Sequence, residues 1–168
     1  MQKHKKVTVL GMPVFNRDTI LQFCQASLEV RKAEYLAELE SLKEAAAGEV
    51  KSSAGDKYET GREMIAQARG IIERNLGEAL SNLEILERMR RAPAKNATEA
   101  ISQIRFSSLV ETDKGWYLFG VSLGEIEVQG GLVTLVSLSS PLGLAIRGKT
   151  AGETVAWRNS KLKILQVL

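Results

Sequence analysis

Apolar residues recur at helical spacing over two long stretches of the chain. In the first, from Asn16 to about Ala47, they repeat every seven residues, with a second set on an adjoining face: Leu21, Leu28, Tyr35, Leu42, Leu39 and Ala46. In the second, which Pro93 ends, they follow the four-three spacing of a coiled-coil seam: Ile65, Ile72, Leu76, Ala79, Leu83 and Leu86. Two helices of about 30 residues joined by a short turn must run antiparallel, so residues 16–91 are predicted to form a hairpin about 45 Å long. Asn16 is a favourable N-cap for the first helix, and residues 1–15 before it form an uninformative tail.

The predicted tip of the hairpin, near residues 52–61, is a Ser- and Gly-rich turn that carries two acidic residues. Asp56 and Glu59 lie three residues apart, and carboxylates at this spacing can converge on one hard cation such as Mg²⁺. They also fit a capping box, in which Asp56 caps the second helix and Glu59 bonds back to it. From these residues alone the capping interpretation is the stronger one.

The spacing of the apolar residues changes after a predicted linker at residues 92–98, Ala-Pro-Ala-Lys-Asn-Ala-Thr. Apolar residues now alternate with polar ones in six short runs, which read as strands at 106–110, 116–122, 125–128, 132–138, 153–158 and 162–167. Pro141 to Ile146 is the exception, because Pro at a first helical position followed by Leu, Ala and Ile indicates one or two helical turns. The fold class is therefore α+β: a helical hairpin followed by a small β-rich domain at 99–168 with one short helix.

Charge and composition exclude several classes of function. With 23 Lys and Arg against 20 Asp and Glu, the net charge of +3 is too weak to argue for nucleic-acid binding on its own. Cys24 is the single cysteine and lies in a helical pattern, which predicts a half-buried, inert thiol and a reducing compartment. His4 is the only histidine, so neither a His/Cys metal cluster nor a Ser-His-Asp triad can be assembled. The apolar runs at 7–15 and 128–146 contain Pro, Gly and Ser and lack the features of a leader or a membrane span, so we expect a cytoplasmic protein without membrane contact.

One short motif matches the phosphate-binding loop G-x-x-x-x-G-K-[ST], from Gly143 through Lys149 to Thr150. Phosphate binding by this motif requires a strand before it and a helix that begins at the Lys-Thr pair. Here the apolar residues inside the motif favour a helix, and Ala151-Gly152 interrupts the chain directly after it. We therefore expect no nucleotide binding, and Lys149→Ala would test this.

The same region resembles a known family. The run from Ser139 to Val155 is similar to the C-terminal signature of the bacterial Gre transcript-cleavage factors, which reads S-P-hydrophobic, then A-L-hydrophobic-G-K, then G-D/E-x-V. The resemblance extends over most of residues 17–168. At the tip, Gly55 and the two acidic positions, Asp56 and Glu59, match the family pattern.

The resemblance implies a fold, a partner and a set of site residues. Gre factors join a coiled-coil hairpin to a domain shaped like the FK506-binding proteins. The domain docks at the entrance of the RNA polymerase secondary channel, and the hairpin reaches the active site. By resemblance, Asp56 and Glu59 would help hold a Mg²⁺ ion shared with the polymerase, and Ser140, Pro141 and Leu142 would belong to the docking surface. The chain would then be an accessory factor without a cofactor of its own. The polymerase would hydrolyse its backtracked transcript, and the factor's contact with the nascent RNA would be indirect.

The tip departs from the family pattern, and this keeps alternatives open. Lys57 and Tyr58 replace a leucine and a serine between the two acids, and Lys57 would compete with Mg²⁺ for them. The chain could therefore bind the channel and inhibit rather than stimulate cleavage. A third possibility is a coiled-coil adaptor without a polymerase role, which would dimerise through Leu21, Leu28, Ile72 and Leu83, whereas a Gre-type factor is expected to be a monomer. Prolyl isomerase activity would rest on fold analogy alone.

Overall fold

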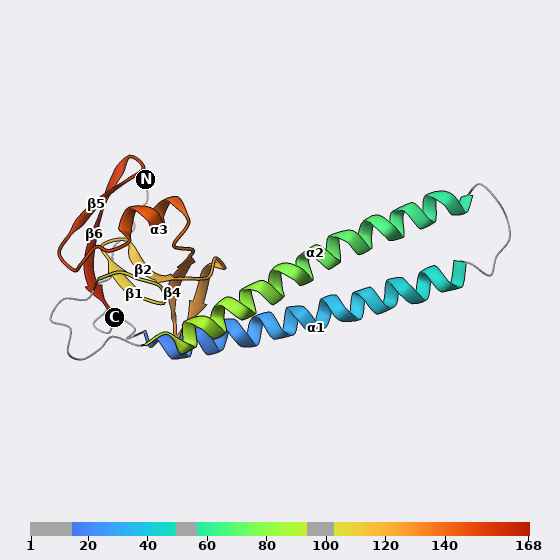
Figure 1. The fold of residues 1–168 in the computed structure, drawn as a ribbon, viewed down its shortest axis with the longest axis horizontal. Helices are drawn as coiled ribbons and strands as arrows, with labels where there is room; N and C mark the ends of the chain where they lie inside the picture. The colour runs from blue at the N-terminus through green and yellow to red at the C-terminus, as the bar shows by residue number, and fades with distance from the viewer. Residues whose placement is uncertain (1–14, 50–56, 94–102) are drawn as a thin grey trace, which may run out of the picture.

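The computed structural model describes residues 15–49, 57–93 and 103–168. Two long helices, α1 (Arg17–Glu49) and α2 (Lys57–Arg91), run antiparallel and together form an arm that projects from a small globular domain at residues 103–168 (Figure 1). The helices contain 33 and 35 residues. The predicted hairpin is thus confirmed, while residues 1–14, the tip at 50–56 and the linker from residue 94 to 102 lie outside the described residues.

The arm begins as its sequence predicts. The Asn16 side-chain oxygen accepts hydrogen bonds from the amides of Asp18 at 2.8 Å and Thr19 at 3.2 Å, which satisfies two amides that the first helical turn leaves without partners. Phe15, directly before the cap, is buried together with Ile20. This cap fixes where α1 starts relative to the domain.

The predicted seam residues face inward along the whole arm, but not to the same depth. Most of those near the globular domain are buried, namely Leu21, Leu28, Ala79 and Leu86, while Leu83 is half-buried. Those farther out are half-buried: Tyr35, Leu42, Ile65 and Ile72. The difference arises because two helices alone cannot surround a seam, whereas near the domain the sheet covers it as well.

The globular domain contains one mixed sheet with the strand order β3-β4-β2-β1-β6-β5. Neighbouring strands are antiparallel except β2 and β4, which are parallel. The strands are β1 (Leu109–Thr112), β2 (Gly115–Phe119), β3 (Gly124–Val128), β4 (Gly131–Val136), β5 (Thr154–Trp157) and β6 (Ser160–Val167). All six predicted strands occur, but β1 begins three residues later than predicted. The reason is that Phe106 and Ser107 form a turn in which Ser107 has a φ of 70°.

The sheet is covered on both faces. Leu109 and Leu118 belong to a core shared with the base of the arm, while their neighbours Val110 and Phe119 belong to a second core with the short helix α3 (Pro141–Ile146). This alternation is the period of two expected of a strand buried on both sides. The sheet therefore lies between the arm and α3, and the arm is part of the fold of the globular domain.

Helix α3 has the bounds that the sequence predicts. Its N-cap is Ser140, whose hydroxyl accepts a hydrogen bond of 3.0 Å from the Gly143 amide, and Pro141 occupies the first turn. Gly143 lies so close to the preceding loop that a Cβ atom there would come within 2.3 Å of the Ser137 carbonyl oxygen. Among the described helices, none has both the length and the apolar character needed to cross a lipid bilayer.

Candidate functional site

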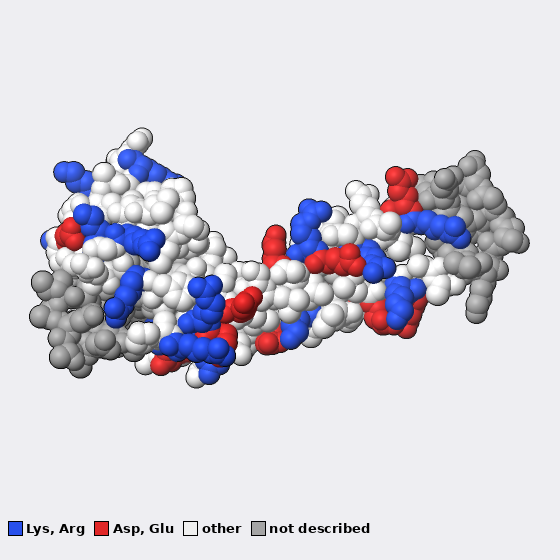
Figure 2. Space-filling view, in the orientation of Figure 1, with Lys and Arg blue, Asp and Glu red and all other residues white. Residues whose placement is uncertain are grey.

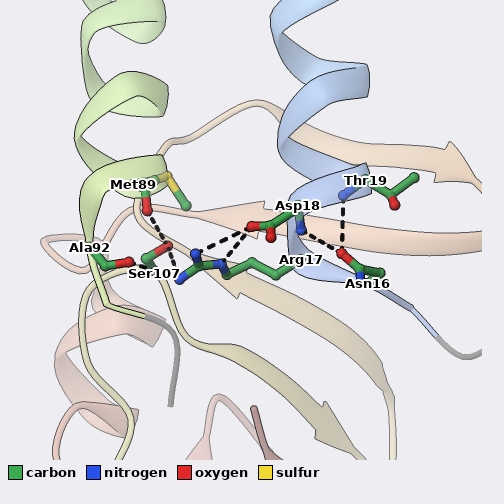
Figure 3. Close-up of polar contacts among 7 residues, drawn as sticks. All are labelled: Asn16, Arg17, Asp18, Thr19, Met89, Ala92 and Ser107. Carbon is green, nitrogen blue, oxygen red and sulfur yellow. Dashed lines mark hydrogen bonds and ion pairs between the residues drawn. The ribbon is translucent and has the colours of Figure 1, made fainter. Parts of the chain in front are cut away.

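The base of the arm is joined to the globular domain by a polar cluster that we call the junction, formed by Arg17, Met89, Ala92 and Ser107 (Figure 3). The Ser107 hydroxyl donates a hydrogen bond of 3.1 Å to the Met89 carbonyl oxygen, and this contact is buried. The Arg17 guanidinium donates to the Ala92 carbonyl oxygen at 3.3 Å and to the Ser107 hydroxyl at 3.5 Å. These donors bond carbonyls at the C-terminal end of α2, where the regular hydrogen-bond pattern of the helix ends. The start of α1, the end of α2 and the turn before β1 are thereby held together.

Packing reinforces the junction. The side chain of Met89 is fully buried and lies so close to Gly120, at the end of β2, that a Cβ atom on Gly120 would meet its sulfur at 2.5 Å. The Arg88 guanidinium lies 5.4 Å from the centre of the Phe106 ring, within the range of a cation–π contact. The direction in which the arm leaves the domain is therefore set by close contacts as well as by hydrogen bonds.

Sequence reasoning did not find Arg17 or Ser107. Their partners lie 75, 90 and 18 residues away along the chain, so no local spacing reveals them. The single sequence signal is Pro93, which ends α2 and implies that the last carbonyls of the helix need donors from elsewhere.

The three predicted docking residues lie together at the start of α3, but they do not all face outward. Ser140 is half-buried as the cap and Pro141 is exposed. Leu142 is 7% exposed and belongs to the core beneath α3, whereas Leu144, two residues later, is 64% exposed. The surface that this rim presents is thus formed by Ser140, Pro141 and Leu144.

The predicted tip acids cannot be placed as a pair. Asp56 lies outside the described residues, and Glu59 belongs to the first turn of α2, where the structure describes the backbone alone. Both the capping box and the metal-binding pair stay predictions. Within the described part of the chain, no group of three or more His, Cys, Asp or Glu side chains is placed to hold a metal ion.

The segment that matches the phosphate-binding loop has a different geometry. Its first half lies in α3, and Thr150 forms a β-bridge with Gln103 instead of starting a helix. The Glu153 carboxylate accepts from the Lys149 ammonium at 3.0 Å and from the Thr150 amide and hydroxyl at 2.6 and 3.1 Å. The Lys149 contact and then the Thr150 amide lower the pKa of Glu153 below its usual value. This segment is a turn stabilised by hydrogen bonds to the Glu153 carboxylate. The Lys149 ammonium and the Thr150 amide and hydroxyl, which would bind phosphate in such a loop, are already bonded to that carboxylate.

Cys24 is more deeply buried than predicted, at 2% exposure, because the sheet covers that part of α1. Burial raises the pKa of its thiol to about 11. A neutral, covered thiol fits the inert structural role predicted for it.

No protein-family model matches this sequence, and no curated protein is significantly similar to it. Solved structures with a similar arrangement include GreA factor homolog 1 (Gfh1) of Thermus thermophilus, 13% identical, with 89% of this chain and 92% of that chain covered and a TM-score of 0.35. Gfh1 of Thermus aquaticus is 16% identical over 84% of this chain and 92% of that chain, with a TM-score of 0.30. Likenesses of this degree assign neither a function nor a site to the chain.

Proposed function

We propose that this chain is a Gre-type regulator that binds RNA polymerase, with its globular domain at the entrance of the secondary channel and its arm directed toward the active site. The observation that carries the proposal is the order of the two parts of the chain, a long helical hairpin followed by a β-rich domain. This is the order expected from the resemblance at residues 139–155. At about 1.5 Å per residue, the 33 residues of α1 give an arm about 50 Å long. The junction holds such an arm in one direction.

The arm has the surface of a helix pair that works in water. Exposed ion pairs one turn apart lie along it, between Lys32 and Glu29, Lys43 and Glu40, and Arg69 and Glu73. Pairs at this spacing each stabilise a solvated helix by about 0.2–0.5 kcal/mol. An arm stabilised along its own length can extend away from the domain without another element to support it.

In this proposal the chain is an accessory factor, and the hydrolysis belongs to the polymerase. Asp56 and Glu59 would contribute carboxylates to a Mg²⁺ ion shared with the polymerase, and the rim at Ser140, Pro141 and Leu144 would contact the polymerase surface. The factor would act as a monomer in the cytoplasm and would meet the nascent RNA only through the elongation complex. If Lys57 neutralises the tip acids, the same docking would block the channel instead of stimulating cleavage.

The burial of the inner seam argues against an adaptor that dimerises through it. Leu21 and Leu28, which would form the dimer seam, are 0% and 3% exposed within a single chain. Dimerisation through them would require the arm to leave its own sheet, at the expense of a core that the monomer already has.

The deciding experiment measures both binding and RNA cleavage with a backtracked elongation complex of the cognate polymerase. Wild-type protein is compared with Asp56→Asn/Glu59→Gln, and with Glu34→Gln/Glu38→Gln as a control of equal charge change on the exposed middle of α1. Cleavage that the tip variant alone loses, with binding retained, supports a cleavage factor. Binding with no cleavage, or with inhibited synthesis, supports a channel blocker. Absence of binding overturns the proposal.

A further inference from the structure

The two ends of the sheet carry opposite charges. At one end, β3 exposes Glu125 and Glu127. Near the other end, β6 exposes Lys161 and Lys163, and the adjoining turns expose Lys114 and Arg158. On the face drawn in Figure 2, Lys and Arg side chains predominate over acidic ones across the globular domain. The net charge of +3 for the whole chain therefore conceals a local segregation of charge.

The strand register places the two lysines of β6 side by side. Because they are two residues apart, their side chains leave the same face of the strand, while Leu162 between them is buried. Opposite them on β5 stand Ala156, paired with Lys161, and Thr154, paired with Lys163. These partners are short and uncharged, so the facing positions on β5 supply no counter-charge.

Two acids beside this surface, Asp113 and Glu153, accept hydrogen bonds from within the chain, and Asp113 places one negative charge next to Lys163. An Asp113 oxygen accepts a hydrogen bond of 2.9 Å from the Lys163 amide, and the Glu153 carboxylate is bonded to Lys149 and Thr150. The Lys114 ammonium donates to the Ser160 hydroxyl, and the Arg158 guanidinium lies 5.5 Å from the centre of the half-buried Trp157 ring. Neither of these two contacts is with an acid.

Protection of a sheet edge does not explain this pattern. Natural sheets do use lysines to prevent pairing with another sheet, but such lysines stand on the edge strand itself. Here the edge strand is β5, Thr-Val-Ala-Trp, which has no charged residue, and the lysines lie one strand further in, on β6.

We propose that Lys114, Arg158, Lys161 and Lys163, together called the basic face, bind the sugar-phosphate backbone of a single-stranded nucleic acid. Lysine ammonium groups bind phosphates as point charges, and the guanidinium of Arg158 is a group that also binds phosphate. Trp157 adds an aromatic surface beside the cations, as in proteins that bind single strands by charge and stacking. The inference stands apart from polymerase binding, which the rim of α3 and the arm would provide. It adds a direct contact with a nucleic-acid strand to the indirect contact with nascent RNA in the proposed function.

The test uses the full chain, fluorescence anisotropy with a labelled single-stranded oligoribonucleotide, and a series of salt concentrations. A polyglutamate peptide serves as the acidic-protein probe. Lys161→Gln/Lys163→Gln is compared with Lys32→Gln/Lys43→Gln, which removes the same charge from the arm. Lys114→Gln/Arg158→Gln is a second, independent variant of the basic face.

We expect wild-type protein to bind the RNA in a salt-dependent manner. The β6 variant should reduce the slope of log K against log salt by about 1.4, since each phosphate contact with a single strand contributes about 0.7. The arm variant should leave the slope unchanged. Equal losses in the β6 and arm variants, unaltered slopes in both basic-face variants, or binding to polyglutamate without binding to RNA would each overturn the proposal.

Discussion

The hydroxyl of Ser107 and the carbonyl oxygen of Met89 are joined by a buried hydrogen bond of 3.1 Å, which links the turn before β1 to the end of the arm. Ser107 adopts a φ of 70°, a conformation that residues other than glycine rarely take. This conformation is compensated by the contacts that the residue makes, because its amide also donates to the Phe119 carbonyl oxygen at 2.7 Å.

Replacing Ser107 with Ala should lower the free energy of unfolding by about 1 kcal/mol, the typical net value of one hydrogen bond. The loss is limited because the Met89 oxygen also accepts from the Ala92 amide at 3.2 Å. Urea denaturation would measure it, with the exposed Ser122→Ala as the matched control, which should change the value by less than about 0.5 kcal/mol. An equal effect of the two substitutions would show that the junction hydrogen bond does not stabilise the fold.

Glycine-to-alanine substitutions should have opposite effects at two positions. Gly143→Ala should destabilise the protein by more than about 2 kcal/mol, because the added Cβ would overlap backbone atoms of Ser137 and Leu138, which cannot move aside as a side chain can. Gly77→Ala in α2 meets nothing within 4 Å and should stabilise the helix by about 0.5–1 kcal/mol. Thermal unfolding of the two variants checks both signs, and a neutral Gly143→Ala would contradict the close approach of α3 to the preceding loop.

Cys24 should react slowly with a thiol reagent at neutral pH in the native protein and rapidly once the protein is unfolded. Its pKa is about 11 in the folded state, against an ordinary value of 9.0. The unfolded state therefore releases its thiol proton first as pH rises, so the contribution of Cys24 to stability is complete below pH 9.0 and declines toward pH 11. Denaturation of wild type and Cys24→Ala across this range would test the sign. Rapid labelling of the native protein would contradict the burial.

Glu153 should make stability depend on pH in the acidic range. Its folded pKa is lowered, first by the Lys149 hydrogen bond and then by the Thr150 amide, so its contribution is present above the ordinary value of 4.5 and lost as pH falls below it. Glu153→Gln should therefore destabilise the protein at neutral pH and reduce the loss of stability on acidification. Glu127→Gln, on the exposed side of β3, is the control and should leave that loss unchanged. If the free energy of unfolding of Glu153→Gln changes with pH in parallel with that of wild type, the Glu153 carboxylate does not cause the loss of stability in acid.

Local patterns in the sequence predicted most of the elements. The apolar residues at helical spacing in the two long helices predicted which face of each helix is covered. Pro141 and the apolar residues that follow it up to Ile146 predicted both ends of α3. The order of strands could not be predicted in this way, because β2 pairs in parallel with β4 although β3 lies between them in the chain. That pairing, like the bonds of Arg17, depends on residues brought together only by the complete fold.

The candidate site was predicted less completely. The family signature predicted a docking surface at Ser140, Pro141 and Leu142, and that role stays a prediction. A run of apolar letters does not say that Leu142 faces the core and Leu144 faces outward. The basic face was missed because net charge sums over the chain, while the register of β5 against β6 decides where the charges gather.

The unequal depth of the seam along the arm has a consequence for how the molecule opens. Near the sheet, Leu28 and Ala79 are almost completely covered, whereas Leu42 and Ile65 are covered by the opposite helix alone. Separating the outer turns exposes less apolar surface, so amide hydrogens there should exchange with deuterium before those beside the sheet, without global unfolding. The outer part of the arm can thus change its shape on meeting a partner while its root keeps the direction that the domain imposes.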